Sequence, residues 1–367
     1  MAFFITLDPR FFLMFFIPSL LFFDCLCGQI CLYTHKQRKD VFNKRNALMK
    51  KIHLQSVIIR LTPLLFTLIP LTSSASDIDI TKAKNIDISA PLKNHISFNS
   101  FDTLSSNEHG LIFNNDINTN SNLGDKAAKL ILAEVTGTEE SKIQGILGIK
   151  GQAANLVIAN PNGISWVDGS ASNISSLSLI AGSLEKQYVK NKENENKLEP
   201  KKLEDYSQLK FSVHPGSQVS INQQQANPIQ LSKINVFADR IKLQNAVNIH
   251  SAIQNYISAS GTASISPREG TMRYGAKFKT DIPYSQSNHL DMSENAKLSG
   301  RLITLESHQY QCKDSFLCPQ NKIDIKGLIQ TMNFSLRGDG EFSISDTGTI
   351  KIGKNLQPLV AQVTKTE

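Results

Sequence analysis

Cysteine is nearly absent from most of this chain. Only five cysteines occur in 367 residues, and three of them, Cys25, Cys27 and Cys31, lie close to the N-terminus. The remaining pair, Cys312 and Cys318, is separated by five residues. Outside the cytoplasm this pair fits a small loop disulfide, and two free thiols fit the sequence equally well. A metal site ranks below both, because it needs further ligands close by.

Net charge is also nearly absent once the N-terminal region is set aside. The chain carries a formal charge of +7, but residues 1–76 contain nine lysines and arginines against three acidic residues. That surplus of six leaves only +1 for residues 77–367. A nucleic-acid-binding domain needs a concentrated basic surface, so this distribution argues against a nucleic-acid partner.

The sequence lacks the common catalytic motifs. No Walker phosphate loop, GxSxG nucleophile elbow or HExxH metal motif occurs, and the eight histidines are scattered. His214 and His250 lie near expected strands, and we interpret them as solvated or capping residues because a site needs several converging groups. Trp166, the single tryptophan, is interpreted as a core residue. The sequence therefore predicts no catalytic, cofactor-binding or metal site.

Long apolar runs are confined to the first 76 residues. The run at 11–23 is shorter than the roughly 20 residues that a membrane span needs. A second run follows Met49-Lys50-Lys51 and ends in small residues, the order of a secretory signal peptide, and we predict cleavage near Ala75. Residues 1–48 are then an upstream misreading of the gene or an unusually long basic extension. A two-helix membrane anchor is the less favoured alternative.

Helical periodicity is almost absent from residue 77 onward. Short stretches alternate between apolar and polar residues instead, which indicates strands with one buried face. Single Gly or Asn turns separate them, a texture typical of a β-solenoid whose coils stack on one another. Such stretches occur at 86–88, 219–221, 241–243, 323–325, 342–344 and 350–352. We therefore expect an all-β fold.

Two segments depart from this texture. Residues 125–134 fit either a helix or an apolar strand with a short lead-in, and the Val135-Thr136-Gly137 that follows favours the strand for the second half. Residues 184–209 contain few apolar residues and mixed charges. We interpret this segment as a solvated loop between coils, with an exposed helical protrusion as the alternative.

The clearest turn signal is Asn160-Pro161-Asn162-Gly163, which lies between the apolar runs 155–159 and 164–167. Pro161 presets φ for the second position of a type I turn, and Asn162 and Gly163 suit the next two. We expect a tight, exposed corner whose role is mainly structural. A role in recognition is the alternative.

Several further motifs surround this turn in a fixed order. They read NHISFNSF at 94–101, GLIFNN at 110–115, ILAEVTG at 131–137, GIKGQAA at 148–154, VIANPNGI at 157–164 and VFADRI at 236–241. Together they resemble the two-partner secretion domain of filamentous haemagglutinins, haemolysins and contact-dependent inhibition exoproteins. Many members of that family carry a Cys-x-x-Cys pair just after the turn, whereas residues 165–170 contain no cysteine.

The resemblance implies a right-handed parallel β-helix with extra-helical hairpins and a charged loop insertion. It divides the chain into an N-terminal extension, a signal peptide, a secretion domain and continuing β-helix coils of a truncated or short chain. These parts span residues 1–48, 49–75, 76–267 (with the charged loop 184–209) and 268–367, respectively.

The resemblance also implies a function. The chain would be a secreted exoprotein, exported through the periplasm after recognition by an outer-membrane transporter with periplasmic docking domains. It would act at a cell surface as an adhesin or haemolysin, meeting a host or neighbouring cell, without enzyme activity or cofactor. Asn160, Pro161, Asn162 and Gly163 form the family motif and the candidate recognition site.

Two other functions stay open at this point. The first is the N-terminal part of a contact-dependent inhibition toxin, whose effector region would lie elsewhere. The second is a β-helical enzyme acting on polysaccharide. This one is disfavoured, because no cluster of Asp, Arg or Lys along one solenoid face is visible in the sequence.

Overall fold

The computed structural model describes residues 80–190, 198–266, 272–275, 289–308, 322–338, 340–354 and 357–358. The predicted signal peptide, its cleavage position Ala75 and the pair Cys312 and Cys318 lie outside these ranges and stay predictions. All of the described residues belong to one compact unit. Within the described ranges, no helix is both long and apolar enough to cross a membrane.

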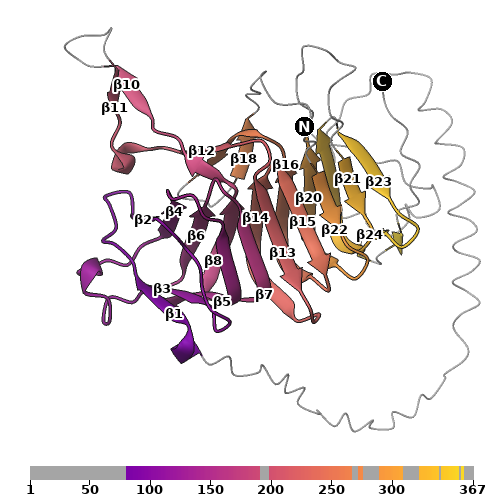
Figure 1. Cartoon of the computed structure of the whole chain (residues 1–367), viewed down its shortest axis with the longest axis horizontal. Coiled ribbons are helices and arrows are strands. Elements are labelled where there is room, and N and C mark those ends of the chain that lie inside the picture. The colour runs from indigo at the N-terminus through magenta and orange to yellow at the C-terminus, as the bar shows by residue number, and fades with distance from the viewer. Residues whose placement is uncertain are drawn as a thin grey trace, which may run out of the picture. The chain divides into compact units, whose positions relative to one another are not determined.

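The described part of the chain is built almost entirely of strands in two long sheets (Figure 1). The first sheet has nine strands, namely β1 (Lys84–Asp87), β3 (Leu111–Asn115), β5 (Ser141–Gly151), β7 (Ile164–Ser172), β13 (Gln218–Gln223), β15 (Arg240–Asn245), β19 (His289–Met292), β21 (Lys322–Ile325) and β23 (Glu341–Ile344). The second has ten, namely β2 (Ile96–Phe101), β4 (Leu130–Val135), β6 (Ala154–Ala159), β8 (Ile174–Ile180), β14 (Pro228–Ala238), β16 (Asn248–Ser258), β20 (Lys297–Ser307), β22 (Leu328–Gly338), β24 (Thr349–Ile352) and β25 (Gln357–Pro358).

The chain passes alternately from one sheet to the other, and each return stacks a strand in parallel on the strand of the preceding coil. The β13–β15 and β14–β16 pairs, for example, are parallel and in continuous order. Among the pairs in these two sheets, only the β24–β25 pair is antiparallel. This arrangement is a parallel β-helix, which confirms the fold class expected from the sequence.

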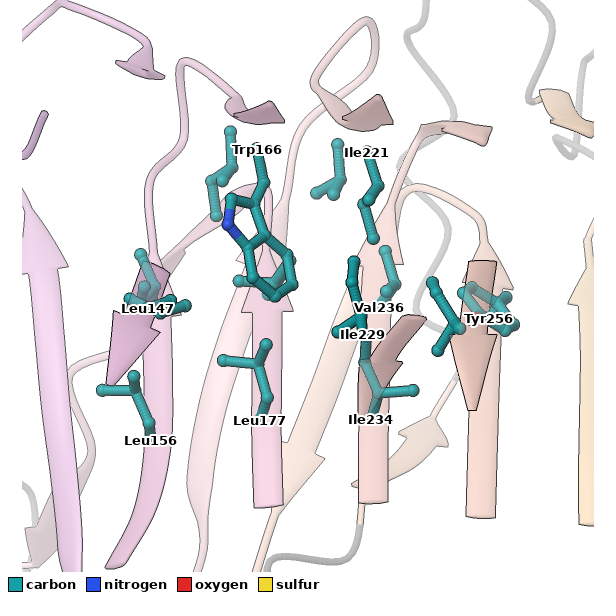
Figure 2. Packing of buried hydrophobic residues seen from close by; sticks show 14 of the residues in the cluster. Leu147, Leu156, Trp166, Leu177, Ile221, Ile229, Ile234, Val236 and Tyr256 are labelled. Carbon is teal, nitrogen blue, oxygen red and sulfur yellow. The ribbon is translucent and has the colours of Figure 1, made fainter. Parts of the chain in front are cut away.

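Apolar side chains fill the interior of the β-helix, and they come from alternate positions along the strands. In β15, for instance, Ile241 and Leu243 are fully buried while their neighbours are partly exposed. Figure 2 shows Trp166 together with Leu177, Ile221 and Ile234 inside this cluster. Because a single coil buries little apolar surface, the stacking of successive coils provides the core.

A smaller antiparallel sheet lies against the outside of the second sheet. It consists of β9 (Gly182–Leu184), β12 (Leu209–Val213), β17 (Gly261–Ile265) and β18 (Met272–Gly275). Residues from both sheets form a second apolar cluster, with Phe211 and Leu209 on one side and Phe237 and Leu132 on the other. The outer face of the second sheet is therefore covered here rather than solvated.

The described part of the charged segment 184–209 contains secondary structure that the sequence did not predict. It contains the antiparallel hairpin of β10 (Tyr188–Lys190) and β11 (Leu198–Pro200) and the short 3-10 helix η4 (Leu203–Asp205). Tyr206 and Leu209 are buried, so the interpretation as a solvated loop is wrong at these two positions, whereas the other described residues from 198 to 208 are exposed or half-buried. The strand interpretation of 130–134 is confirmed, because these residues belong to β4.

Candidate functional site

The Asn160–Gly163 corner joins β6 of the second sheet to β7 of the first. The Gly163 N–H donates to the Asn160 carbonyl at 3.1 Å, which closes a β-turn over the four residues. Gly163 has φ of 110°, a value that glycine adopts without strain. A Cβ at this position would also lie 3.0 Å from the Gln218 carbonyl oxygen of the next coil. The turn expected from the sequence is therefore confirmed.

The side chain of Asn160 connects this corner to the preceding coil. Its Nδ2 donates to the Glu139 carbonyl and to Ser141 Oγ, each at 2.9 Å. Its Oδ1 accepts the Asn162 N–H at 2.9 Å, while its own backbone N–H donates to the Ile180 carbonyl at 3.0 Å. Asn160 therefore forms hydrogen bonds with the coil before its own and with the coil after it. Both Asn160 and Ser141 are fully buried.

The expectation of an exposed corner is correct for only half of it. Asn160 and Gly163 are buried, Pro161 is half-buried, and Asn162 is exposed. Asn162 Nδ2 still donates to the Gly137 carbonyl at 2.7 Å, which is a second tie to the preceding coil. The contacts of Asn160 with Glu139 and Ser141 exist only because coils stack, so the sequence around the turn could not reveal them.

Trp166, three residues after the corner, lies fully buried in the apolar core and contacts two glycines. Its Nε1 donates to the Gly145 carbonyl at 3.1 Å, at a point where the pairing of β5 with β7 shifts register. Gly145 has φ of 68° at this bulge. A Cβ at Gly169 would overlap the indole ring. Trp166 is therefore a core residue, as the sequence analysis interpreted it.

Glu134 connects the β-helix to the extra-helical sheet. It lies on β4, half-buried, and its Oε1 accepts the Leu184 N–H at 2.9 Å. Burial raises the pKa of Glu134 above its ordinary value, and the hydrogen bond from the Leu184 N–H and the charge of Lys186 only partly offset this effect. Glu134 was not predicted from the sequence as a functional residue. The signal for it was a single charged residue within the otherwise apolar run 130–135.

A second long-range contact links η4 to the first coil. Asn94 Nδ2 donates to the Leu203 carbonyl at 3.1 Å, and Lys93 Nζ lies 3.6 Å from Glu204 Oε1. A cleft of about 940 Å³ lies beside this contact, lined by both segments and by Lys129 and Tyr206. The insertion after β8 therefore folds back over the start of the β-helix.

The residues considered for chemistry do not converge. His250 Nδ1 lies 3.0 Å from Ser299 Oγ on the surface, and the His214 carbonyl accepts a turn hydrogen bond from Ser217. Among the described residues, no three His, Cys, Asp or Glu side chains are grouped as metal ligands would be. The acidic pair Asp291 and Asp324 is bridged by Lys326 at 3.0 and 3.3 Å.

The family model of the TPS secretion domain matches residues 73–276, more than half of the chain. A "Hemolysin" of Serratia marcescens is 37% identical over 113 residues, which are 28% of this chain and 7% of the relative. The "Filamentous hemagglutinin" of Bordetella pertussis is 37% identical over 112 residues, 28% of this chain and 3% of the relative. The "16S rRNA endonuclease CdiA" of Enterobacter cloacae is 31% identical over 146 residues, 35% of this chain and 4% of the relative.

These matches cover less than a tenth of each of these curated relatives. The solved filamentous haemagglutinin secretion domain aligns with 74% of this chain and 91% of its own, at 22% identity and a TM-score of 0.49. The family match spans the strands from β1 to β18, which include the Asn160–Gly163 corner and the extra-helical sheet described above. The chain belongs to the family of TPS secretion domains.

Proposed function

We propose that this chain is the secretion domain of an exported adhesin or haemolysin of the filamentous haemagglutinin kind. An outer-membrane transporter with periplasmic docking domains recognises it and exports it to the cell surface. The observation that carries the proposal is the family match over residues 73–276, which covers the strands from β1 to β18. The Serratia and Bordetella relatives, named as haemolysin and haemagglutinin, support the same class of exoprotein.

The β-helix suits export as an unfolded chain. Each coil packs mainly against its neighbours, so coils can fold in succession as they emerge and bury apolar residues such as Leu243 and Ile249. An extended chain can also pair with a sheet edge of the transporter before it folds. Neither process needs an enzyme site or a cofactor, and we propose a purely non-enzymatic role.

The experiment is co-expression of the chain with its cognate transporter, followed by measurement of the protein in the culture medium. We expect export to require the transporter, and N-terminal sequencing of the exported form to place its start near residue 76. A mature protein that begins before residue 60 would contradict the signal-peptide prediction. Export at the same level without the transporter would contradict the proposal.

The corner offers a way to separate recognition from folding. Asn162 is exposed, whereas Asn160 is buried and holds three coils together. If the corner is mainly structural, Asn162→Ala leaves export close to normal, and Asn160→Ala lowers export together with stability. If Asn162→Ala abolishes export while the free energy of unfolding is unchanged, the corner is a recognition site.

A second candidate is the front part of a contact-dependent inhibition toxin. Several relatives are named CdiA, including the Enterobacter protein at 31% identity and a "Toxin CdiA" of Escherichia coli at 34% identity over 129 residues. An immunity gene downstream of the coding sequence would favour this candidate over an adhesin or haemolysin. A transporter gene next to it is expected in either case.

A further inference from the structure

The Asn160–Gly163 corner contains a chemically labile pair of residues. Asn162 and Gly163 form the single Asn-Gly sequence in the chain. Asparagine is one of the labile residues that heat-stable proteins contain less often. In an unfolded chain its side-chain carbon can meet the backbone nitrogen of the next residue, and a glycine there has no side chain to block the approach. This pair is therefore the first place in the chain to expect spontaneous deamidation.

The reaction needs only water. The Gly163 nitrogen loses its proton to solvent and forms a bond to the side-chain carbon Cγ of Asn162. The bond from Cγ to Nδ2 breaks, Nδ2 takes up a proton and leaves as ammonia, and a cyclic imide remains. Water then opens the imide at either carbonyl carbon, which leaves aspartate or isoaspartate at position 162.

The folded corner holds both reacting groups away from this reaction. The Gly163 N–H donates to the Asn160 carbonyl at 3.1 Å, and Gly163 is buried, which keeps solvent from its proton. The Asn162 Nδ2 donates to the Gly137 carbonyl at 2.7 Å and to Asn160 Oδ1 at 3.1 Å, which fixes the side-chain amide against the preceding coil. Attack on Cγ requires the loss of these hydrogen bonds, so the corner must open before Asn162 can react.

The products do not fit the corner that asparagine fits. An aspartate carboxylate has no hydrogen to donate, so its oxygens would face the Gly137 carbonyl and Asn160 Oδ1, which are both acceptors. Isoaspartate places an additional carbon in the backbone, which moves the Gly163 N–H away from the Asn160 carbonyl. Gly163 has little room for such a shift, because even a Cβ there would lie 3.0 Å from the Gln218 carbonyl oxygen.

We propose that Asn162 is a modification site that deamidates in the unfolded chain and that folding of the corner protects. A chain that stays unfolded gradually loses the ability to build the corner, whereas a folded chain keeps its asparagine. An unfolded chain therefore has a limited time in which it can still fold. The consequence for export rests on the proposed function, because it applies only to a chain that crosses the periplasm unfolded, but the chemistry of the corner does not.

The test is peptide mass spectrometry of the full chain after incubation at mildly alkaline pH, either folded or unfolded in guanidinium chloride. We expect Asn162 to deamidate at least about tenfold faster in the unfolded chain than in the folded chain. Asn160 is an internal control in the same peptide, because the following Pro161 has no backbone N–H and cannot form the imide. An isoaspartate-specific methyltransferase identifies the isoaspartate product.

Two variants separate the protection from the effect of the product. Asn160→Ala removes the Oδ1 acceptor and loosens the corner, so it should speed deamidation of Asn162 in the folded chain and leave the rate in guanidinium chloride unchanged. Asn162→Asp reproduces one product and should unfold at a lower urea concentration than Asn162→Ala. The alanine variant only removes hydrogen bonds, whereas the aspartate also places a carboxylate against two acceptors.

Equal rates at Asn162 in the folded and the unfolded chain would overturn the protection by the corner. A rate at Asn162 no higher than at Asn160 in the unfolded chain would overturn the modification site. If Asn162→Asp is as stable as Asn162→Ala, the product fits the corner and deamidation does not hinder folding. The transporter takes no part in these measurements, so a failure of the proposed function would leave their results unchanged.

Discussion

The Nδ2 atom of Asn160 donates a hydrogen bond to Ser141 Oγ at 2.9 Å, between two neighbouring coils of the β-helix, and both residues are fully buried. The same nitrogen donates to the Glu139 carbonyl. A turn residue thereby acts as a brace between coils. This relationship explains why an asparagine, rather than any other turn-forming residue, begins the corner.

Asn160→Ala should destabilise the protein, because the Glu139 carbonyl and Ser141 Oγ lose their buried donor. We expect a loss of about 1–3 kcal/mol in the free energy of unfolding. Urea unfolding followed by Trp166 fluorescence measures it. Asn162→Ala is the matched control and should cost less than about 1 kcal/mol, since Asn162 is exposed. Equal stability of wild type and Asn160→Ala would show that these hydrogen bonds between coils do not stabilise the protein.

Gly169→Ala should strain the core beside the single tryptophan. The added Cβ would overlap the indole ring of Trp166, which is fully buried and must shift. Overpacking of this kind costs about 1–3 kcal/mol. We expect a lower urea midpoint and a red shift of the tryptophan emission. Ser170→Ala, one residue along the same strand, is the control and should leave the emission unchanged.

Glu134 should make stability depend on pH. Burial raises its pKa in the folded protein above the ordinary value of 4.5, so folding favours the protonated form. The contribution of Glu134 to the free energy of unfolding is therefore fully present below pH 4.5. It is lost as the pH rises through the raised pKa of the folded protein. Glu134→Gln keeps an acceptor for the Leu184 N–H and cannot ionise.

The matching measurement compares the free energy of unfolding of wild type and Glu134→Gln between about pH 4 and pH 8. The variant should gain stability relative to wild type as the pH rises. A constant difference across this range would show that Glu134 does not titrate differently in the folded and unfolded states.

Lys326 should stabilise the C-terminal coils modestly, because its ammonium group contacts two carboxylates that would otherwise repel each other. Asp291 and Asp324 occupy paired positions on β19 and β21, and the hydrogen bond to Asp291 raises the pKa of Lys326. The side chain of Lys326 is 37% exposed, so solvent weakens the interaction. Lys326→Gln should cost less than about 1 kcal/mol. Thermal unfolding at low and at 1 M salt tests this, because the cost should shrink as salt screens the carboxylates.

The sequence by itself determined the local structure of this protein. The alternation of apolar and polar residues predicted strands with one buried face at 219–221 and 241–243. Both segments are strands, and their apolar residues Val219, Ile221, Ile241 and Leu243 are fully buried. Four turn-forming residues predicted the Asn160–Gly163 corner, because Pro, Asn and Gly restrict φ locally. The ordered motifs also indicated the family.

The tertiary structure alone decided how these elements meet. Alternation shows which face of a strand is buried, but not which strand lies beside it, so the Asn160–Ser141 contact and the pairing of β8 with β14 across the insertion were hidden. The fold of segment 184–209 was hidden for the same reason. Its Tyr206 and Leu209 are buried because the second sheet offers an apolar outer face, and that face exists only once the coils have stacked.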